Sequence, residues 1–121
     1  MQVEIDKNGP SSVAIITDPD LSIQNTQDAL DLMVEIKHNY DCHKMILPKE
    51  KLPEAFFQLS TGLAGEILQK YTNYDMKLAI VGSFDMYDSK SLEDFIRESN
   101  RGNQVYFLPD VDIALEVLHN H

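Results

Sequence analysis

Short apolar runs alternate with segments of helical periodicity along this chain, and that alternation limits its fold more than any other feature. Lys77 to Gly82 (Lys-Leu-Ala-Ile-Val-Gly) is apolar after its first residue and ends at a glycine, which is typical of a central strand covered on both faces. Comparable runs lie at residues 13–17, 44–47 and 105–108. Because strands that alternate with helices form largely parallel sheets with right-handed crossovers, we expect an α/β fold.

An antiparallel hairpin is expected at the N-terminus. Val3 and Ile5 alternate with polar residues, as in a half-buried strand. A turn signal at residues 7–10 (Lys-Asn-Gly-Pro) separates them from the run at 13–17, because Asn-Gly tolerates positive φ and proline cannot continue a ladder. The hairpin adds an antiparallel edge, which predicts a five-stranded mixed sheet.

Four helices complete the predicted order ββαβαβαβα. Apolar residues recur at helical spacing at about residues 24–38, 53–71, 91–101 and 110–118. Gly62 and Gly65 fall inside the second segment, where each glycine costs roughly 1 kcal/mol relative to alanine. They predict either a new helix start near Ser60 or close packing against a neighbouring backbone. At 121 residues the chain has the size of one domain, so residues 1–121 are expected to form a single unit.

Charge and composition exclude several classes of partner. The chain has 20 acidic and 10 basic residues, a formal net charge of −10. That field repels phosphate backbones and anionic lipids, so we expect neither nucleic acid nor a membrane as a partner. No apolar run approaches the roughly 18 residues of a transmembrane helix, and the first residues lack the apolar core of a secretory signal. Because the single cysteine, Cys42, cannot form an intrachain disulfide, we expect a soluble, cytoplasmic protein.

One segment is similar to the signature of a known family. Residues 59–65 (Leu-Ser-Thr-Gly-Leu-Ala-Gly) resemble the Asp-Ser-Ser-Gly-Leu-Gly motif of STAS domains, the fold of bacterial anti-sigma-factor antagonists and their SpoIIAA-like relatives. The pattern continues through the apolar run that ends at Gly82, the run at 105–108 and the last helix. The chain also resembles a bacterial family described only as a domain of unknown function. These resemblances imply a single STAS-like domain with its helices mainly on one face of the sheet. They imply this fold more directly than they imply an activity.

The STAS resemblance also implies a regulatory site. In that family the hydroxyl residue directly before the first glycine accepts a phosphate at the start of a helix; that residue is Thr61 here, with Ser60 and Gly62 beside it. A phosphate at a helix start is stabilised by free N–H groups and by the helix dipole. The family's acidic residue before the motif is Leu59 in this chain. The alternative is structural: the hydroxyls only cap a helix, or Thr61 lies within a helix that continues from Pro53.

A second candidate patch combines Arg97, Asn100 and Arg101 near the end of the third helix. The two arginines are four residues apart and could hold an anion or the carboxylate of a partner. The alternative is an exposed helix end, where cations interact favourably with the dipole.

No metal site is predicted. One helix carries a polar stripe of four residues: Asp28, Asp31, Glu35 and His38. Hard cations usually draw their ligands from a loop or from several elements, and zinc favours thiolate or more imidazole. A solvated helix face is therefore the better interpretation.

Two histidine-containing segments are also expected to be structural. Cys42 and His43 lie in a polar turn without a third group to orient an imidazole, which argues against a nucleophilic pair. His119 and His121 are expected to lie in a frayed C-terminal end.

We therefore expect a non-catalytic, cytoplasmic interaction module without cofactors. It would bind a protein partner around Ser60, Thr61 and Gly62, and phosphorylation there would regulate the binding. A homodimer through an exposed strand edge is the other expected assembly. The alternative is a carrier of a small apolar ligand or lipid, which the SpoIIAA-like resemblance also implies. Its pocket could be lined by Phe56, Phe57, Phe84, Met86 and Tyr87. A third hypothesis is an enzyme of unknown reaction that uses Cys42 and His43, although no phosphate-binding loop, zinc motif or nucleophile elbow is present.

Overall fold

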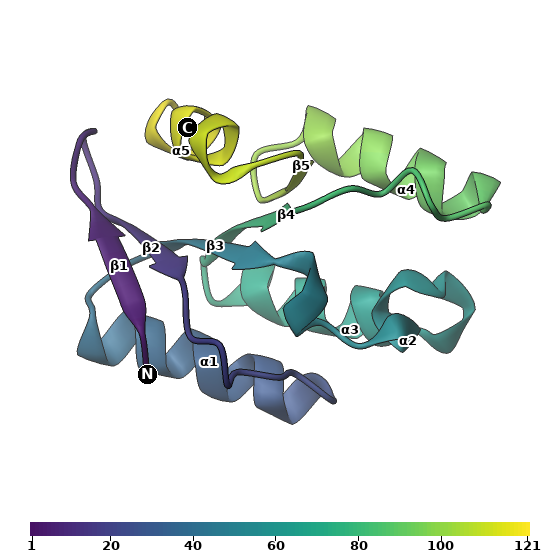
Figure 1. The fold of residues 1–121 in the computed structure, drawn as a ribbon, viewed down its shortest axis with the longest axis horizontal. Coiled ribbons are helices and arrows are strands. Elements are labelled where there is room, and N and C mark those ends of the chain that lie inside the picture. The colour runs from purple at the N-terminus through teal and green to yellow at the C-terminus, as the bar shows by residue number, and fades with distance from the viewer.

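Five strands form one mixed sheet whose spatial order follows the chain, β1-β2-β3-β4-β5 (Figure 1). The computed structural model describes residues 1–121. The strands are β1 (Val3–Asp6), β2 (Val13–Ile16), β3 (Lys44–Pro48), β4 (Lys77–Val81) and β5 (Val105–Leu108). β1 pairs with β2 antiparallel, and every other neighbouring pair is parallel. The predicted α/β class and mixed sheet with an N-terminal hairpin are confirmed.

Five α-helices and two short 3-10 turns connect the strands. They are α1 (Thr26–Asn39), η1 (Lys49–Lys51), α2 (Glu54–Phe57), η2 (Leu59–Thr61), α3 (Leu63–Asn73), α4 (Lys90–Arg101) and α5 (Val111–His119). The second predicted helix is therefore interrupted, because Gln58 leaves the helical region and Gly62 is left-handed with φ 80°. No helix combines the length and the apolar character needed to cross a membrane.

The two faces of the sheet carry separate apolar clusters. Alternate strand residues, among them Leu47, Leu78 and Phe107, belong to a larger cluster that α1, α2, α3 and α4 cover. The intervening residues, among them Ile46 and Ala79, belong to a smaller cluster that α5 covers. Figure 1 shows α1 and α3 on one side of the strands and α5 on the other. Four of the five helices thus share one face, and the single remaining helix covers the second.

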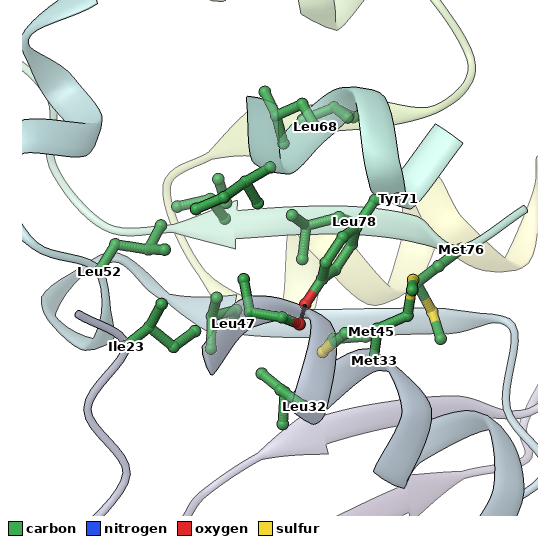
Figure 2. Packing of buried hydrophobic residues seen from close by; sticks show 14 of the residues in the cluster. Ile23, Leu32, Met33, Met45, Leu47, Leu52, Leu68, Tyr71, Met76 and Leu78 are labelled. Carbon is green, nitrogen blue, oxygen red and sulfur yellow. Dashed lines mark hydrogen bonds between the residues drawn. The ribbon is translucent and has the colours of Figure 1, made fainter. Parts of the chain in front are cut away.

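Tyr71 connects α3 to α1 inside the larger cluster. Its side chain is 1% exposed, and its hydroxyl donates a 2.7 Å hydrogen bond to the carbonyl of Ala29 (Figure 2). Burial raises the pKa of the Tyr71 phenol well above its ordinary value. The hydroxyl therefore remains a donor, which satisfies the only polar group of this side chain in an apolar environment.

Lysines from two neighbouring strands hold the C-terminal end of α5. Lys44 of β3 donates a 2.5 Å hydrogen bond to the carbonyl of Leu118, and Lys77 of β4 donates one of 2.7 Å to the carbonyl of His121. Both ammonium groups meet the negative end of the helix dipole. Burial, and secondarily the charge of Lys77, lower the pKa of Lys44.

Candidate functional site

The corner at residues 59–62 ends one turn and begins the next helix. η2 ends at Thr61, Gly62 takes a left-handed conformation, and α3 begins at Leu63. The structure thus contains the helix restart that was one of the two interpretations of Gly62 and Gly65. Close packing is not the reason for Gly65, because a Cβ atom built there would meet nothing within 4 Å. Thr61 lies directly before a helix start and not inside an unbroken helix.

The hydroxyl of Thr61 is occupied by contacts within this corner. Its Oγ1 lies 2.7 Å from the carbonyl oxygen of Ala55 and 2.9 Å from that of Gln58, and it accepts a 3.3 Å hydrogen bond from the N–H of Leu63. A hydroxyl has one proton, so the two carbonyls share a single donor. Thr61 therefore fixes the turn between α2 and α3, although its side chain lies at the surface.

Ser60 is exposed like Thr61 but differs from it in the state of its hydroxyl. Its hydroxyl makes no hydrogen bond, and the residue is exposed on the wall of an open groove of about 770 Å³. We call this the Ser60 groove. Its lining residues are Glu54, Phe57, Gln58, Leu59, Ser60, Met86, Tyr87, Asp88, Ser89 and Ser91. Residues of the segment 54–60 thus form one side, and the loop after β4 together with the first turn of α4 forms the other.

Lys49 holds the loop side of the Ser60 groove in place. It follows β3 directly, and its ammonium group donates a hydrogen bond to the carbonyl of Ser83 in the loop after β4. The same group lies 4.9 Å from the ring centre of Tyr87, at cation–π distance, and 3.3 Å from the sulfur of Met86. Sites of α/β sheets commonly form beyond the carboxyl ends of parallel strands. Lys49 links the carboxyl end of β3 to Met86 and Tyr87 of the groove wall.

Gly82 allows the approach of Lys49. Its φ is 149°, and a Cβ atom at this position would lie 2.8 Å from Cγ of Lys49. The position therefore requires glycine for its conformation and for space. The sequence pattern predicted Gly82 only as the end of a strand and did not single out Lys49, so both roles were missed. The available signal was a glycine and a lysine that each follow the end of a buried parallel strand.

The aromatic residues of the carrier hypothesis pack mainly on one another. Phe57 and Tyr87 are stacked, with ring centres 5.0 Å apart, and Phe84 lies edge-on to Phe107 at 5.5 Å. Phe56 is 1% exposed and belongs to the larger apolar cluster. Of the five residues, Phe57, Met86 and Tyr87 line the Ser60 groove, and Met86 is 67% exposed. The groove consequently has an apolar side next to the free hydroxyl of Ser60.

The ionisable residues on the wall of the Ser60 groove give it an acidic character. Glu54 and Asp88 are both exposed there, and no basic residue belongs to the lining. Burial, and secondarily the charge of Glu54, raise the pKa of Tyr87. The Tyr87 phenol therefore remains neutral and keeps its role as a stacking surface.

The predicted patch of Arg97, Asn100 and Arg101 is already engaged within the chain. Arg97 forms ion pairs with Asp94 at 2.9 Å and Glu93 at 3.4 Å. Arg101 pairs with Glu98 at 3.4 Å. The structure therefore places a carboxylate against each guanidinium of the patch and does not bring the two arginines together around an open anion site.

Asn100 is exposed, but its side-chain amide hydrogen-bonds to the sheet. Its side-chain oxygen accepts a 2.7 Å hydrogen bond from the N–H of Phe107, and its amide donates one of 3.1 Å to the carbonyl of the same residue. Asn100 thus pairs with the outer edge of β5 as a neighbouring strand would.

The remaining clusters have structural surroundings. No group of three or more His, Cys, Asp or Glu side chains is arranged to hold a metal ion. Cys42 is 1% exposed, and burial, with a smaller effect of Asp41, raises the pKa of its thiol. A raised pKa lowers the fraction of nucleophilic thiolate. His43 is exposed and makes no hydrogen bond with Cys42.

The comparisons with known proteins give a family and no relative of established activity. No curated protein and no solved structure matches the chain. A family model described as a domain of unknown function, DUF4180, matches residues 8–118. That match extends from the hairpin turn into the last turn of α5 and includes the whole Ser60 groove. The chain belongs to the DUF4180 family.

Proposed function

We propose that this protein is a non-catalytic, cytoplasmic interaction module that binds a protein partner in the Ser60 groove and is regulated by phosphorylation of Ser60. The observation that carries the proposal is the exposed, unbonded hydroxyl of Ser60 beside the apolar side chains of Phe57 and Met86. The resemblance of residues 59–65 to the STAS signature supports the same corner. A STAS-like regulator would present such a hydroxyl next to a helix start.

Ser60 is a better phosphate acceptor than Thr61 because of what each hydroxyl already does. A phosphate on Thr61 would remove the hydroxyl proton that is shared between the carbonyls of Ala55 and Gln58. A phosphate on Ser60 breaks no hydrogen bond. It adds a charge of about −1.5 to −2 beside the apolar wall of the groove, where it would repel an acidic partner or attract one that carries arginine.

A pair of tryptophan substitutions tests the partner-binding part of the proposal. Ser60→Trp fills the groove, whereas Ser11→Trp places the same side chain at an exposed serine outside it. Partners would be recovered from extract of the native host with wild type and both variants and compared by quantitative mass spectrometry. We expect a protein that wild type and Ser11→Trp retain and Ser60→Trp loses at least tenfold. Equal retention by all three, or no retained protein, would contradict the proposal.

Regulation is tested separately by incubation with ATP in the same extract. We expect a mass increase of one phosphate that Ser60→Ala abolishes and Thr61→Ser preserves. Phosphate found only on Thr61 would show that the regulatory part of the proposal is wrong. Partner binding could still stand in that case, because the two measurements are independent.

A second candidate function is transport of a small apolar molecule. Phe57, Leu59, Met86 and Tyr87 supply the apolar part of the groove lining. Native mass spectrometry of freshly purified protein tests it: a carrier would retain a lipid or other apolar molecule, and Met86→Glu would release it. An unliganded mass after exposure to host lipids would remove this candidate.

A further inference from the structure

The two edges of the sheet differ in their free hydrogen-bonding groups. At the β5 edge, Asn100 pairs with the N–H and the carbonyl of Phe107. β1 forms the opposite edge (Figure 1), and its one neighbouring strand is β2. An unblocked edge strand is a template for a further strand, which proteins normally prevent by covering or charging it.

The register identifies which groups of β1 remain free. The N–H of Thr17 donates a 3.1 Å hydrogen bond to the carbonyl of Gln2, and Glu4 lies opposite Ile15. In an antiparallel ladder every second residue directs both its backbone groups toward the partner strand. Gln2 and Glu4 therefore bond toward β2, while Val3 and Ile5 direct their N–H and C=O groups away from the sheet.

The surface around this edge is acidic on both faces of the sheet. Glu4 is exposed and forms no ion pair, whereas Val3 and Ile5 pack from the other side of the strand against the larger cluster. A recess of about 340 Å³ adjoins the residue that precedes β1. Its lining residues are Met1, Leu21, Ser22, Asp28, Asp31, Leu32 and Glu35, so it contains three carboxylates and no basic group.

Glu4 also disfavours pairing of β1 with a second copy of itself. Because Val3 and Ile5 carry the free groups, only two antiparallel registers overlap three of the four β1 residues. One places Glu4 opposite Glu4 of the second copy, and the other places it opposite Asp6. Like charges directly opposite each other destabilise a strand pair. The net charge of −10 adds a general repulsion between copies.

We propose that the free edge of β1 binds an extended segment of another protein in which basic and apolar residues alternate. Main-chain hydrogen bonds to Val3 and Ile5 supply the strand pairing. Basic side chains of the segment lie opposite Glu4, and its apolar side chains lie beside those of Val3 and Ile5. This surface is separate from the Ser60 groove, and it assigns Glu4 a specific role: it selects a basic strand and rejects a second acidic copy.

The test uses the whole protein and two synthetic peptides, acetyl-KVKVKVK-amide and acetyl-EVEVEVE-amide. At low ionic strength we expect the lysine peptide to shift the amide NMR signals of Val3 and Ile5 and to slow their hydrogen exchange at least tenfold. We expect the glutamate peptide to have no such effect on wild type. Binding of the lysine peptide that shifts residues of the Ser60 groove and leaves Val3 and Ile5 unchanged would overturn the proposal.

Two matched controls separate strand pairing from simple charge attraction. Val3→Pro removes an N–H that faces the open edge and leaves the protein's charge unchanged. In the second control the protein is unchanged and the valines of the lysine peptide are N-methylated, so that this peptide cannot form the hydrogen bonds of a strand pair. We expect each change to weaken binding at least tenfold, and undiminished binding in both would contradict the proposal.

Substitution of Glu4 provides a second readout. We expect Glu4→Lys to bind the glutamate peptide in preference to the lysine peptide, and Glu4→Thr to form a concentration-dependent dimer in light scattering where wild type is a monomer. A Glu4→Lys variant that keeps the wild-type preference would show that Glu4 does not select the strand.

Discussion

The imidazole Nε2 of His119 lies 2.7 Å from Oδ1 of Asp6, which joins the end of α5 to the first strand. Only 12% of the His119 side chain and 17% of the Asp6 side chain are exposed. The ring also packs against Gly9 in the hairpin turn, where an added Cβ atom would lie 2.2 Å from Nδ1. The expectation that His119 lies in a frayed end is therefore wrong: it closes the smaller face of the sheet.

This contact gives stability a specific dependence on pH. The backbone N–H of Asn8, and secondarily His119, hold the pKa of Asp6 below its ordinary value of 3.8. A carboxyl group whose pKa is lower in the folded state contributes its full stabilisation at pH values above its pKa in the unfolded state. That contribution is lost as the pH falls through its pKa in the folded state. We expect wild type to be more stable than Asp6→Asn at pH 6, with the difference shrinking below about pH 4. Urea unfolding at several pH values measures it.

The control for this prediction is Glu116→Gln on α5, which changes an exposed carboxylate that accepts no side-chain hydrogen bond. The difference in unfolding free energy between Glu116→Gln and wild type should stay nearly constant over the same pH range. A constant difference for Asp6→Asn as well would show that the contact does not set the acid response.

Gly9→Ala should displace His119 from Asp6. The new methyl group overlaps the imidazole, and overpacking of this kind costs about 1–3 kcal/mol. In a His119→Ala background most of the overlap disappears, so the same substitution should cost markedly less. A double-mutant cycle by chemical denaturation measures this coupling, and additive effects would rule out the proposed overlap.

Asn100→Ala should expose the outer edge of β5. It leaves the N–H and carbonyl of Phe107 without their partner, for which we expect a loss of about 1–2 kcal/mol in unfolding free energy and faster exchange of the Phe107 amide. Asn103→Ala changes an exposed asparagine in the same connection and serves as the control. Unchanged exchange at Phe107 in Asn100→Ala would contradict the edge-pairing role.

The two glycines of the Ser60–Gly65 segment should respond oppositely to alanine. Gly62→Ala forces a side chain into a left-handed conformation, which costs about 1–2 kcal/mol. Gly65→Ala adds a methyl group in open space within the first turn of α3 and should stabilise the fold by about 0.4–1 kcal/mol. Thermal and urea unfolding of the two variants test this contrast, and destabilisation by both would show that Gly65 has a packing role.

The strands and most of the helices could be predicted because their signals are local. Val13–Ile16 and Lys77–Val81 are short β-rich runs bounded by turn residues, and each was placed to within one or two residues. The interruption before α3 could be predicted only as one of two alternatives. Residues 53–59 have the apolar pattern of a continuous helix, and that pattern does not show that Gly62 adopts a left-handed conformation. The motif position of Ser60 could be found from sequence, but the free state of its hydroxyl could not.

The sequence by itself determined the order of strands and helices, since backbone preference and hydrophobic alternation act between near neighbours. Only the tertiary structure decided which polar groups meet: His119 with Asp6, 113 residues away, and Lys49 with Ser83, 34 residues away. Such contacts form because the sheet topology brings segments that are distant in the sequence to the same edge or face. Their energies arise from burial and hydrogen bonding in the assembled fold, which no local preference encodes.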